Sequence, residues 1–452
     1  MVDVAAELAR VLGSKVVVDT DRMSPWTRDQ SPLAKVGTPA AVVRATSVED
    51  VVTTLRLASQ TGTPLVTRGA GSGLSGGANA SDGCIVLSVE GMNQILDIDV
   101  ARRTATVQPG VINADLGKAV AEHGLRYTPD PGSRDISSIG GNIATNAGGM
   151  SCCKYGVTAD HVAALTAVLP DGSVIRTGGS TRKNVAGLDL TRLLIGSEGT
   201  LAVVVEATVW LRPAVEEEAT VVAMFPTLEQ AMRAVVALTA ATTPSAVELM
   251  DRTTVAAVNA MTGMDIDATA EAVLLVTYDG ASAAADAASS EAGAAAQGAS
   301  EVFRTDDRVE GTELMSARRM ALPALERLGS ILLDDVGVPV ERLPAMVADI
   351  QAIATKHEVT IGTFGHAADG NLHPTIIYDA EDAGQRERAL AAFTDIVRAA
   401  LALGGTISGE HGIGSLKMPF VSEMYGEAEV ALMHRIKHAF DPQGVMNPGR
   451  GY

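Results

Sequence analysis

Apolar and polar positions alternate in short blocks along the first half of the chain. Runs rich in Val and Ile recur between segments with a helical period, a pattern typical of strands and helices in succession. A helix is predicted from about 48 to 60, opened by a capping box at Ser47 and Asp50, and another over 112–124. Strands are predicted over 40–45, 63–68, 84–89 and 104–110, a hairpin over 161–178 with Asp171-Gly172 at its turn, and a strand ending near Pro213.

Beyond Pro213 the pattern changes to strand-helix-strand units. Strands are predicted over 220–225, 271–280 and 301–304. A helix follows the first, opened by a second capping-box pattern from Thr227 to Gln230. The alanine-rich segment 281–297 is predicted as a surface helix, because alanine is the best helix former. These units predict an α+β layer, distinct from the first half, with helices on one face of a sheet.

Charge and composition narrow the class of protein. The 452 residues carry a net charge of −19 and contain no run of about five or more basic residues, which disfavours nucleic acid and anionic membranes as partners. No apolar stretch approaches the roughly 18 to 20 residues of a membrane-spanning helix, and the N-terminus lacks the basic start of a signal peptide. Three cysteines, two of them adjacent at 152 and 153, give no disulfide framework. We therefore expect a soluble cytoplasmic protein.

Glycine is concentrated in a few segments. The loop Gly69–Gly77 contains G-x-G-x-x-G at 71–76, but a strand rather than a helix is predicted after it, which argues against a dinucleotide-binding fingerprint. Glycines still allow backbone N–H groups to converge on an anion such as a pyrophosphate. Alone, the cluster could equally be a flexible surface loop. Further small-residue segments at 131–149, 196–200 and 447–450 favour close backbone approach to a bulky polar ligand.

Two histidines flank a predicted turn in the second half. Asp369-Gly370 lies between two β-rich runs, which predicts a two-residue hairpin turn. With that turn, or a longer one with the same centre, His366 pairs directly with His373. Directly opposed residues share a face of the sheet, so the two imidazoles could bind one metal. The alternative is a pair of unrelated strand histidines.

The order of these motifs resembles the flavin-dependent D-2-hydroxyacid dehydrogenases of the vanillyl-alcohol oxidase superfamily, which include D-lactate dehydrogenase and the glycolate oxidase D subunit. The motifs are RGAGSGLSGG, DPGS, IGGNIATNAGG, KYG, IGSEGTL, GHAADGNLH, SGEHGIG and a terminal NPGR, and they cover about residues 25–452. The resemblance implies a two-subdomain FAD-binding domain over 1–213, an α+β cap domain with an antiparallel sheet over 214–405, and a C-terminal segment, 406–452, that returns to the FAD domain.

The resemblance also implies which residues bind FAD. Some members of the superfamily attach flavin covalently through a histidine in the first glycine loop, but this loop has Ser72 and no histidine, so non-covalent FAD is expected. The implied FAD-binding residues are Arg68, Gly69, Ala70, Gly71, Ser72, Gly73, Leu74, Ser75, Gly76, Gly77, Pro131, Gly132, Ser133, Ser138, Gly140, Gly141, Asn142, Ala144, Gly199, Val204 and Asn447.

In the family a glutamate joins the two histidines on a divalent metal, and here it would be Glu410. Two nitrogens and one carboxylate fit Zn²⁺, and also Fe²⁺ or Mn²⁺. The adjacent His411 is the implied catalytic base, since a neighbouring cation favours its neutral form; a fourth ligand or an outer-shell residue is the alternative. Arg318 is the implied binder of the substrate carboxylate, although Arg318-Arg319 could also be a solvated helix face.

We therefore expect an FAD- and metal-dependent dehydrogenase that oxidises a small D-2-hydroxy acid to the 2-keto acid. A lysine of the 2-hydroxyglutarate-specific pattern is replaced by Leu333, which favours D-lactate or glycolate over a dicarboxylate. The alternatives are 2-hydroxyglutarate specificity, a non-catalytic flavoprotein subunit and a metal-dependent hydrolase. No haem or iron–sulfur motif is present, so the acceptor would be oxygen, a quinone, a cytochrome or a partner subunit.

Overall fold

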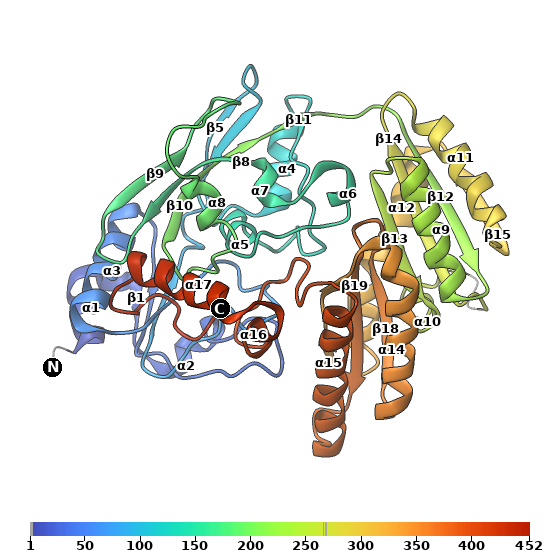
Figure 1. Cartoon of the computed structure of the whole chain (residues 1–452). Coiled ribbons are helices and arrows are strands. Elements are labelled where there is room, and N and C mark those ends of the chain that lie inside the picture. The colour runs from blue at the N-terminus through green and yellow to red at the C-terminus, as the bar shows by residue number, and fades with distance from the viewer. Residues whose placement is uncertain (1–2, 265, 267–268) are drawn as a thin grey trace. The chain divides into compact units, whose positions relative to one another are not determined.

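The computed structural model describes residues 3–264, 266 and 269–452 (Figure 1). The chain divides into two compact units. Unit 1 consists of residues 1–148, 156–214 and 410–452, and unit 2 consists of 149–155 and 215–409. Residues 149–155 pack with unit 2, which no pattern along the chain indicated.

The first layer of unit 1 is a four-stranded sheet in the order β1-β2-β4-β3. β2, β4 and β3 are parallel, and β1 pairs with β2 in the antiparallel sense. The predicted capping box is confirmed: the Ser47 hydroxyl accepts the Asp50 N–H, and the Asp50 carboxylate accepts the Ser47 N–H. The elements are α1 (Val4–Leu12), β1 (Val16–Val17), α2 (Thr20–Met23), β2 (Ala41–Arg44), α3 (Val48–Thr61), β3 (Leu65–Arg68) and β4 (Ile85–Ser88), with short 3₁₀ turns at Gly13–Lys15 and Ser24–Trp26.

The second layer of unit 1 is an antiparallel sheet in the order β5-β6-β10-β8-β9. The predicted hairpin is present as β8 and β9, in which Val168 pairs with Val174 around the Asp171-Gly172 turn. The elements are β5 (Ile95–Asp99), β6 (Thr104–Val107), α4 (Asn113–Ala121), α5 (Ile139–Thr145), α7 (Thr158–His161), β8 (Val162–Val168), β9 (Val174–Gly178), α8 (Leu190–Leu194) and β10 (Val203–Trp210), with a small pair of β7 (Leu125–Arg126) and β11 (Arg212–Pro213).

The C-terminal segment of unit 1 packs against the first layer. It contains a 3₁₀ turn at Met418–Phe420 and the helices α16 (Val421–Met424) and α17 (Glu427–Phe440). After α17 the chain returns to β3, where Met446 bridges Leu65 in the parallel sense. Val445 and Met446 join the hydrophobic core around β2, β3 and β4, so the terminal motif is fixed beside the strand that leads into the first glycine loop.

Unit 2 is built on one large antiparallel sheet in the order β15-β12-β14-β13-β18-β19-β16, with β17 also paired to β19. The alanine-rich segment is a helix, α11, as predicted. The elements are α6 (Cys152–Tyr155), β12 (Glu218–Phe225), α9 (Leu228–Ala241), β13 (Ala246–Asp251), α10 (Arg252–Thr262), β14 (Ala272–Asp279), α11 (Ala283–Ala296), β15 (Glu301–Thr305), α12 (Arg308–Arg319), α13 (Ala321–Glu326), β16 (Ser330–Leu333), β17 (Val336–Gly337), α14 (Leu343–His357), β18 (Thr360–His366), β19 (Asn371–Tyr378) and α15 (Ala383–Ala402), with short 3₁₀ turns at Val340–Arg342 and Ala367–Asp369.

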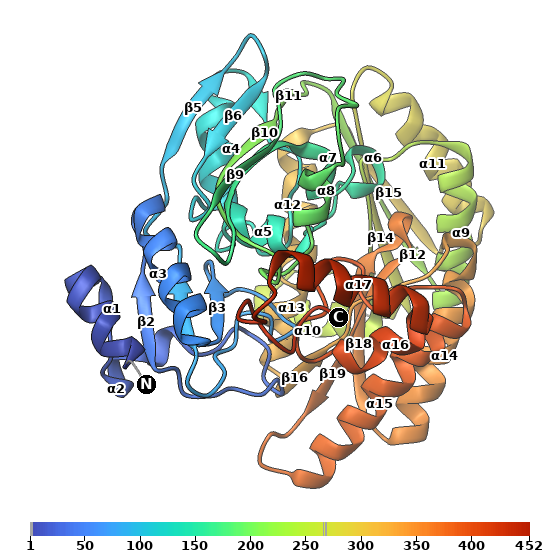
Figure 2. The same ribbon diagram turned by 60° about the vertical axis from the view of Figure 1, so that its left-hand side comes forward.

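Helices cover both faces of this sheet, which corrects the expectation of one covered face. Successive residues of a strand point to opposite faces. In β12, Val221 faces α9 and α11, with which it lines an apolar cavity of about 180 Å³. Its neighbour in the strand, Thr220, faces α12 on the other side, where a Cβ added to Gly311 would lie 2.7 Å from the Thr220 hydroxyl. The full burial of β14 agrees with cover on both sides. On one side α14 and α15 run next to each other (Figures 1 and 2).

Among the described residues, no helix is both long and apolar enough to cross a lipid bilayer.

Candidate active site

The first glycine loop of unit 1 follows β3 and contains no helix. Gly71 and Gly76 have φ values of +71° and +79°, which residues with a side chain rarely adopt. The loop runs on to strand β4 without a helical turn, so the rejection of a dinucleotide-binding fingerprint from the sequence is confirmed. A Cβ on Gly69 would collide with the hydroxyl of Ser138, so glycine is needed for contact with the second glycine segment.

The second glycine segment begins α5 and packs directly against the first loop. The Ser138 hydroxyl caps this helix by accepting the Gly141 N–H at 3.3 Å, and it also accepts the Ala70 N–H at 3.4 Å. Asn142 is buried, with its side-chain carbonyl accepting from Asn113. Gly132 has open space around it, since an added Cβ would meet no atom of the described residues within 4 Å. The two segments therefore form one surface made of backbone and small polar groups.

The third and terminal segments meet the same loop. The side-chain NH₂ of Asn447 donates to the carbonyl oxygens of Gly77, at 3.1 Å, and of Glu198, at 2.7 Å. Gly199 lies beside Thr67, in the strand that precedes the loop, and Val204 lies in β10. All segments with the FAD-binding residues implied by the family resemblance therefore lie in unit 1, and hydrogen bonds or close contacts join the loop to the second, third and terminal segments.

Buried polar groups without partners show how this region fits an anionic cofactor. Arg68 ends β3 and is only 5% exposed. Its Nε and Nη1 have no hydrogen-bond partner in the described part of the chain, and neither does the side-chain oxygen of Asn447. Burial lowers the pKa of Arg68, while the charges of Glu90 and Asp29 act against that shift. A buried guanidinium with unused N–H groups behind a glycine loop suits a phosphate-bearing ligand such as FAD.

The histidine hairpin of unit 2 has a different register from the predicted one. His366 pairs with Asn371, and His373 pairs with Phe364. The predicted direct pairing of the two histidines is therefore wrong, because the loop has four residues, 367–370, and is centred one residue earlier. A shift of two positions keeps both side chains on one face. The two rings lie 5.1 Å apart between centroids, so the histidines still converge.

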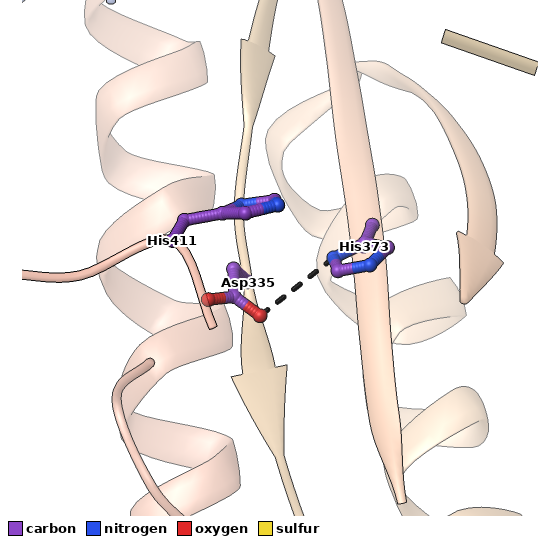
Figure 3. A group of neighbouring side chains, drawn as sticks. All are labelled: Asp335, His373 and His411. Atoms are coloured by element: carbon purple, nitrogen blue, oxygen red, sulfur yellow. Dashed lines mark ion pairs between the residues drawn. The ribbon is translucent and has the colours of Figure 1, made fainter. Parts of the chain in front are cut away.

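Each histidine has a buried carboxylate beside Nδ1. His366 Nδ1 lies 2.7 Å from Glu248 Oε1, and His373 Nδ1 lies 3.7 Å from Asp335 Oδ1, the pair joined by the dashed line in Figure 3. Burial raises the pKa of Glu248, but the charges of His366 and Arg318 outweigh that effect and the net pKa is lowered. An ionised Glu248 can only accept, so Nδ1 of His366 is the donor in this pair, and Nε2 is the ring nitrogen that does not face Glu248.

Arg318 lies at the end of α12 and belongs to the same cluster. Its Nε is 2.7 Å from Glu248 Oε2, and its guanidinium lies 4.6 Å from the ring centre of Phe364. The side chain is only 7% exposed, so Arg318 is not part of a solvated helix face. Because Nε faces Glu248, the two terminal nitrogens form the other edge of the guanidinium, the edge that binds carboxylates in bidentate pairs.

Glu410 and His411 begin the last segment of unit 1. His411 Nε2 lies 3.8 Å from Glu410 Oε1, and the Ser75 hydroxyl donates to the His411 carbonyl oxygen at 3.1 Å. Glu410 is also the second residue after Ser408, whose hydroxyl donates to Asp335 at 2.9 Å in unit 2. The candidate base is thus held by its main chain against the first glycine loop.

Comparisons with known proteins identify the family. The family described as FAD linked oxidases, C-terminal domain, matches residues 214–450, and the family described as FAD binding domain matches 39–178. The glycolate oxidase subunit GlcD of Bacillus subtilis is 40% identical over 99% of this chain and 96% of its own length. The D-lactate dehydrogenase of Archaeoglobus fulgidus is 36% identical over 90% of each chain. The chain belongs to the FAD-linked oxidase family. It is therefore an FAD-dependent oxidoreductase, as the motifs predicted.

Solved structures place this FAD-linked oxidase in the fold class expected from the sequence. p-Cresol methylhydroxylase matches with a TM-score of 0.82 at 19% identity, over 99% of this chain and 96% of that one. 4-Ethylphenol oxidase from Gulosibacter chungangensis matches with a TM-score of 0.81 at 20% identity, over the same shares. The α+β fold of the vanillyl-alcohol oxidase type, with its antiparallel sheets, is confirmed.

Sequence reasoning missed three acidic residues of this FAD-linked oxidase. Glu248 and Asp335 lie beside the histidines, and Glu198 accepts hydrogen bonds from the segment after His411. A signal existed for two of them: Glu248 interrupts the apolar run Ala-Val-Glu-Leu-Met, and Asp335 is one of two acids directly after an apolar strand. Charged residues at such positions are almost never fully buried unless they are paired.

Proposed function

We propose that this FAD-linked oxidase oxidises a small D-2-hydroxy acid, D-lactate or glycolate, to the corresponding 2-keto acid. The observation that carries the proposal is the cluster in unit 2, where two histidine rings converge beside a buried arginine. His366 and Arg318 both face Glu248, and His373 faces Asp335. Such a group suits a substrate that carries both a carboxylate and a hydroxyl. The names of the relatives, glycolate oxidase subunit and D-lactate dehydrogenase, support the same substrate class.

The four small-residue segments of unit 1 would hold FAD non-covalently. Arg68 would supply a positive charge for the pyrophosphate, and backbone N–H groups of the first two segments would surround it. Ser72 stands where some superfamily members have the histidine that bonds to flavin. Bound there, FAD would supply a two-electron acceptor for the hydrogen on C2 of the substrate.

His366, His373 and Glu410 would hold a divalent metal. A histidine that binds a metal through one ring nitrogen commonly donates the N–H of the other to a carboxylate. Both histidines have such a carboxylate beside Nδ1. Glu410 would complete a set of two nitrogens and one carboxylate, which suits Zn²⁺, Fe²⁺ or Mn²⁺. A bound cation would make the substrate hydroxyl more acidic and would orient it.

The remaining steps belong to the side chains. Arg318 would bind the substrate carboxylate with its terminal nitrogens, while Glu248 keeps the guanidinium in place. His411 would take the hydroxyl proton on an imidazole nitrogen as the hydrogen leaves C2. Leu333 is buried in β16 and offers no charge to a second carboxylate, which favours a monocarboxylate over 2-hydroxyglutarate.

Anaerobic mixing of the FAD-loaded protein with D-lactate, glycolate and D-2-hydroxyglutarate tests the proposal. The flavin absorbance should bleach with one of the first two acids and far more slowly with the third. His411→Ala should abolish bleaching and retain FAD, while His438→Ala, at an exposed site on α17, should behave like wild type. Rapid bleaching by 2-hydroxyglutarate would reverse the substrate assignment. A flavin left oxidised by all three acids would favour a non-catalytic subunit, and a His411→Ala protein that bleached normally would refute the base.

A further inference from the structure

Glu198 is a buried acid of unit 1 that the proposed chemistry does not use. It is 8% exposed and has a positive φ of 51°, a conformation uncommon for residues other than glycine. Its backbone N–H donates to Ala144, and its carbonyl accepts from Asn447. The second glycine segment and the terminal motif therefore fix its main chain, which directs the side chain to one place.

The carboxylate of Glu198 accepts hydrogen bonds from the main chain just after His411. Oε1 accepts the Ile413 N–H at 2.7 Å, and Oε2 accepts the Gly414 N–H at 2.8 Å. The fit is close, since a Cβ on Gly412 would lie 3.0 Å from Oε1 and one on Gly77 would lie 3.2 Å from Oε2. Two hydrogen bonds from successive amides to one carboxylate fix both the position and the direction of this turn.

Ser75 of the first glycine loop holds the other side of the same turn. Its hydroxyl donates to the His411 carbonyl at 3.1 Å, and its own carbonyl accepts from the N–H groups of Ser415 and Leu416 at 3.0 and 3.1 Å. The backbone from His411 to Leu416 is thus held between Ser75 and Glu198. We propose that Glu198 is a positioning residue that fixes the His411 turn relative to the flavin-binding loops. This inference rests on the proposed role of His411.

The test compares Glu198→Gln and Glu198→Ala with Asp50→Asn in the FAD-loaded protein. Gln keeps the size but replaces one acceptor oxygen with an NH₂ group, which would face a backbone N–H. Asp50 is a matched control, because it is also buried and accepts two backbone N–H groups, from Thr46 and Ser47, at a helix start without a proposed catalytic role. Amide hydrogen exchange over residues 410–417 and the flavin bleaching rate at saturating hydroxy acid are measured.

Both Glu198 variants should exchange the Ile413 and Gly414 amides at least about tenfold faster, since each loses a charge-assisted hydrogen bond. The bleaching rate should fall about 100-fold, which is the effect expected when a catalytic group is misplaced by about 1 Å. The FAD content and the substrate concentration that gives half the maximal rate should stay unchanged. Asp50→Asn should alter neither readout. Unchanged exchange, or faster exchange with a normal bleaching rate, would overturn the proposal.

The two readouts separate this inference from the proposed function. If no 2-hydroxy acid bleaches the wild-type flavin, the proposed function fails, and the exchange measurement still decides whether Glu198 holds the turn. Should Glu198→Ala not fold, the isosteric Glu198→Gln carries the test alone.

Discussion

The net pKa of a buried carboxylate in this chain depends on the groups that face it. Glu248 faces His366 and Arg318, and their charges lower its pKa even though burial alone would raise it. Asp251 and Glu198 face mainly backbone N–H groups, and for both of them burial raises the pKa. Neutral N–H donors compensate less of the desolvation penalty than full positive charges do. A glutamate is therefore an ion-pair partner at one position, Glu248, and an acceptor of backbone hydrogen bonds at another, Glu198.

Asp251 gives a prediction for pH dependence. Burial raises its pKa to about 6, although the N–H groups of Thr254 and Thr363 act in the opposite direction. The folded state then binds more protons than the unfolded state, so the stability from this group is complete below about pH 3.8 and is lost as the pH rises through about 6. Between about pH 5 and pH 7.5, the free energy of unfolding of wild type should fall relative to that of Asp251→Asn by about 1 kcal/mol.

Urea unfolding at a series of pH values measures this difference. Asp382→Asn is the control, because Asp382 caps α15 at an exposed site and its pKa is lowered by the hydrogen bonds that it accepts from Gln385. Its contribution is lost only as the pH falls below the ordinary carboxyl range, so its difference from wild type should stay constant over this interval. A constant difference for Asp251→Asn as well would refute the assignment.

Glu248 gives a prediction about metal binding. Glu248→Gln keeps the shape but removes the charge that faces His366 and Arg318. Affinity for Zn²⁺ should fall about 10- to 100-fold, the usual effect of removing a partner that orients a ligand histidine. Equilibrium dialysis against Zn²⁺ with metal analysis measures this without reference to activity. Glu229→Gln, on the exposed side of α9, should bind as wild type does, and equal affinity in the two variants would contradict the role of Glu248.

Single helices and strands were predicted correctly where the interaction that forms them joins residues close together in the sequence. The capping box at Ser47 and Asp50 joins residues three positions apart, and α3 begins where it predicts. The alanine-rich segment forms α11 because helix propensity acts within the segment. The predicted register of the histidine hairpin is wrong because the conformation of its loop depends on packing against the segment after β17, around Val338. Gly370 has a φ of +72°, and an added Cβ would collide with the Val338 carbonyl.

Gly370→Ala tests that explanation of the hairpin loop. The variant should lose more than about 1 kcal/mol of the free energy of unfolding, because alanine is strained at positive φ and its Cβ also meets a backbone oxygen. Gly263→Ala is the matched control: φ is +73° there, but an added Cβ meets no atom of the described residues within 4 Å, so the backbone strain is the expected effect. Chemical unfolding compares the two. Equal destabilisation would show that contact with Val338 does not fix the loop.

At the level of the whole molecule, the chain passes between its two units more than once. Residues 149–155 pack with unit 2, where Lys154 and Tyr155 both bind the carboxylate of Asp279, at 2.5 and 2.7 Å. The chain then returns to unit 1 at Gly156 and leaves it again after Ala214. The net charge of −19 gives no attraction for an anionic substrate, so the proposed site depends on local cations such as Arg318 and a bound metal.

The order of most strands and helices, the places where glycine is concentrated and the motifs that identify an FAD-linked oxidase could all be read from the residues alone. These features are local, since each depends on neighbouring residues and their backbone preferences. The register of the histidines and the partners of the buried acids, in contrast, depend on the packing of distant segments. Glu248 meets His366 across 118 positions, and Glu198 meets Ile413 across 215. Such contacts depend on how distant strands and loops pack, and no periodic pattern along the chain records that packing.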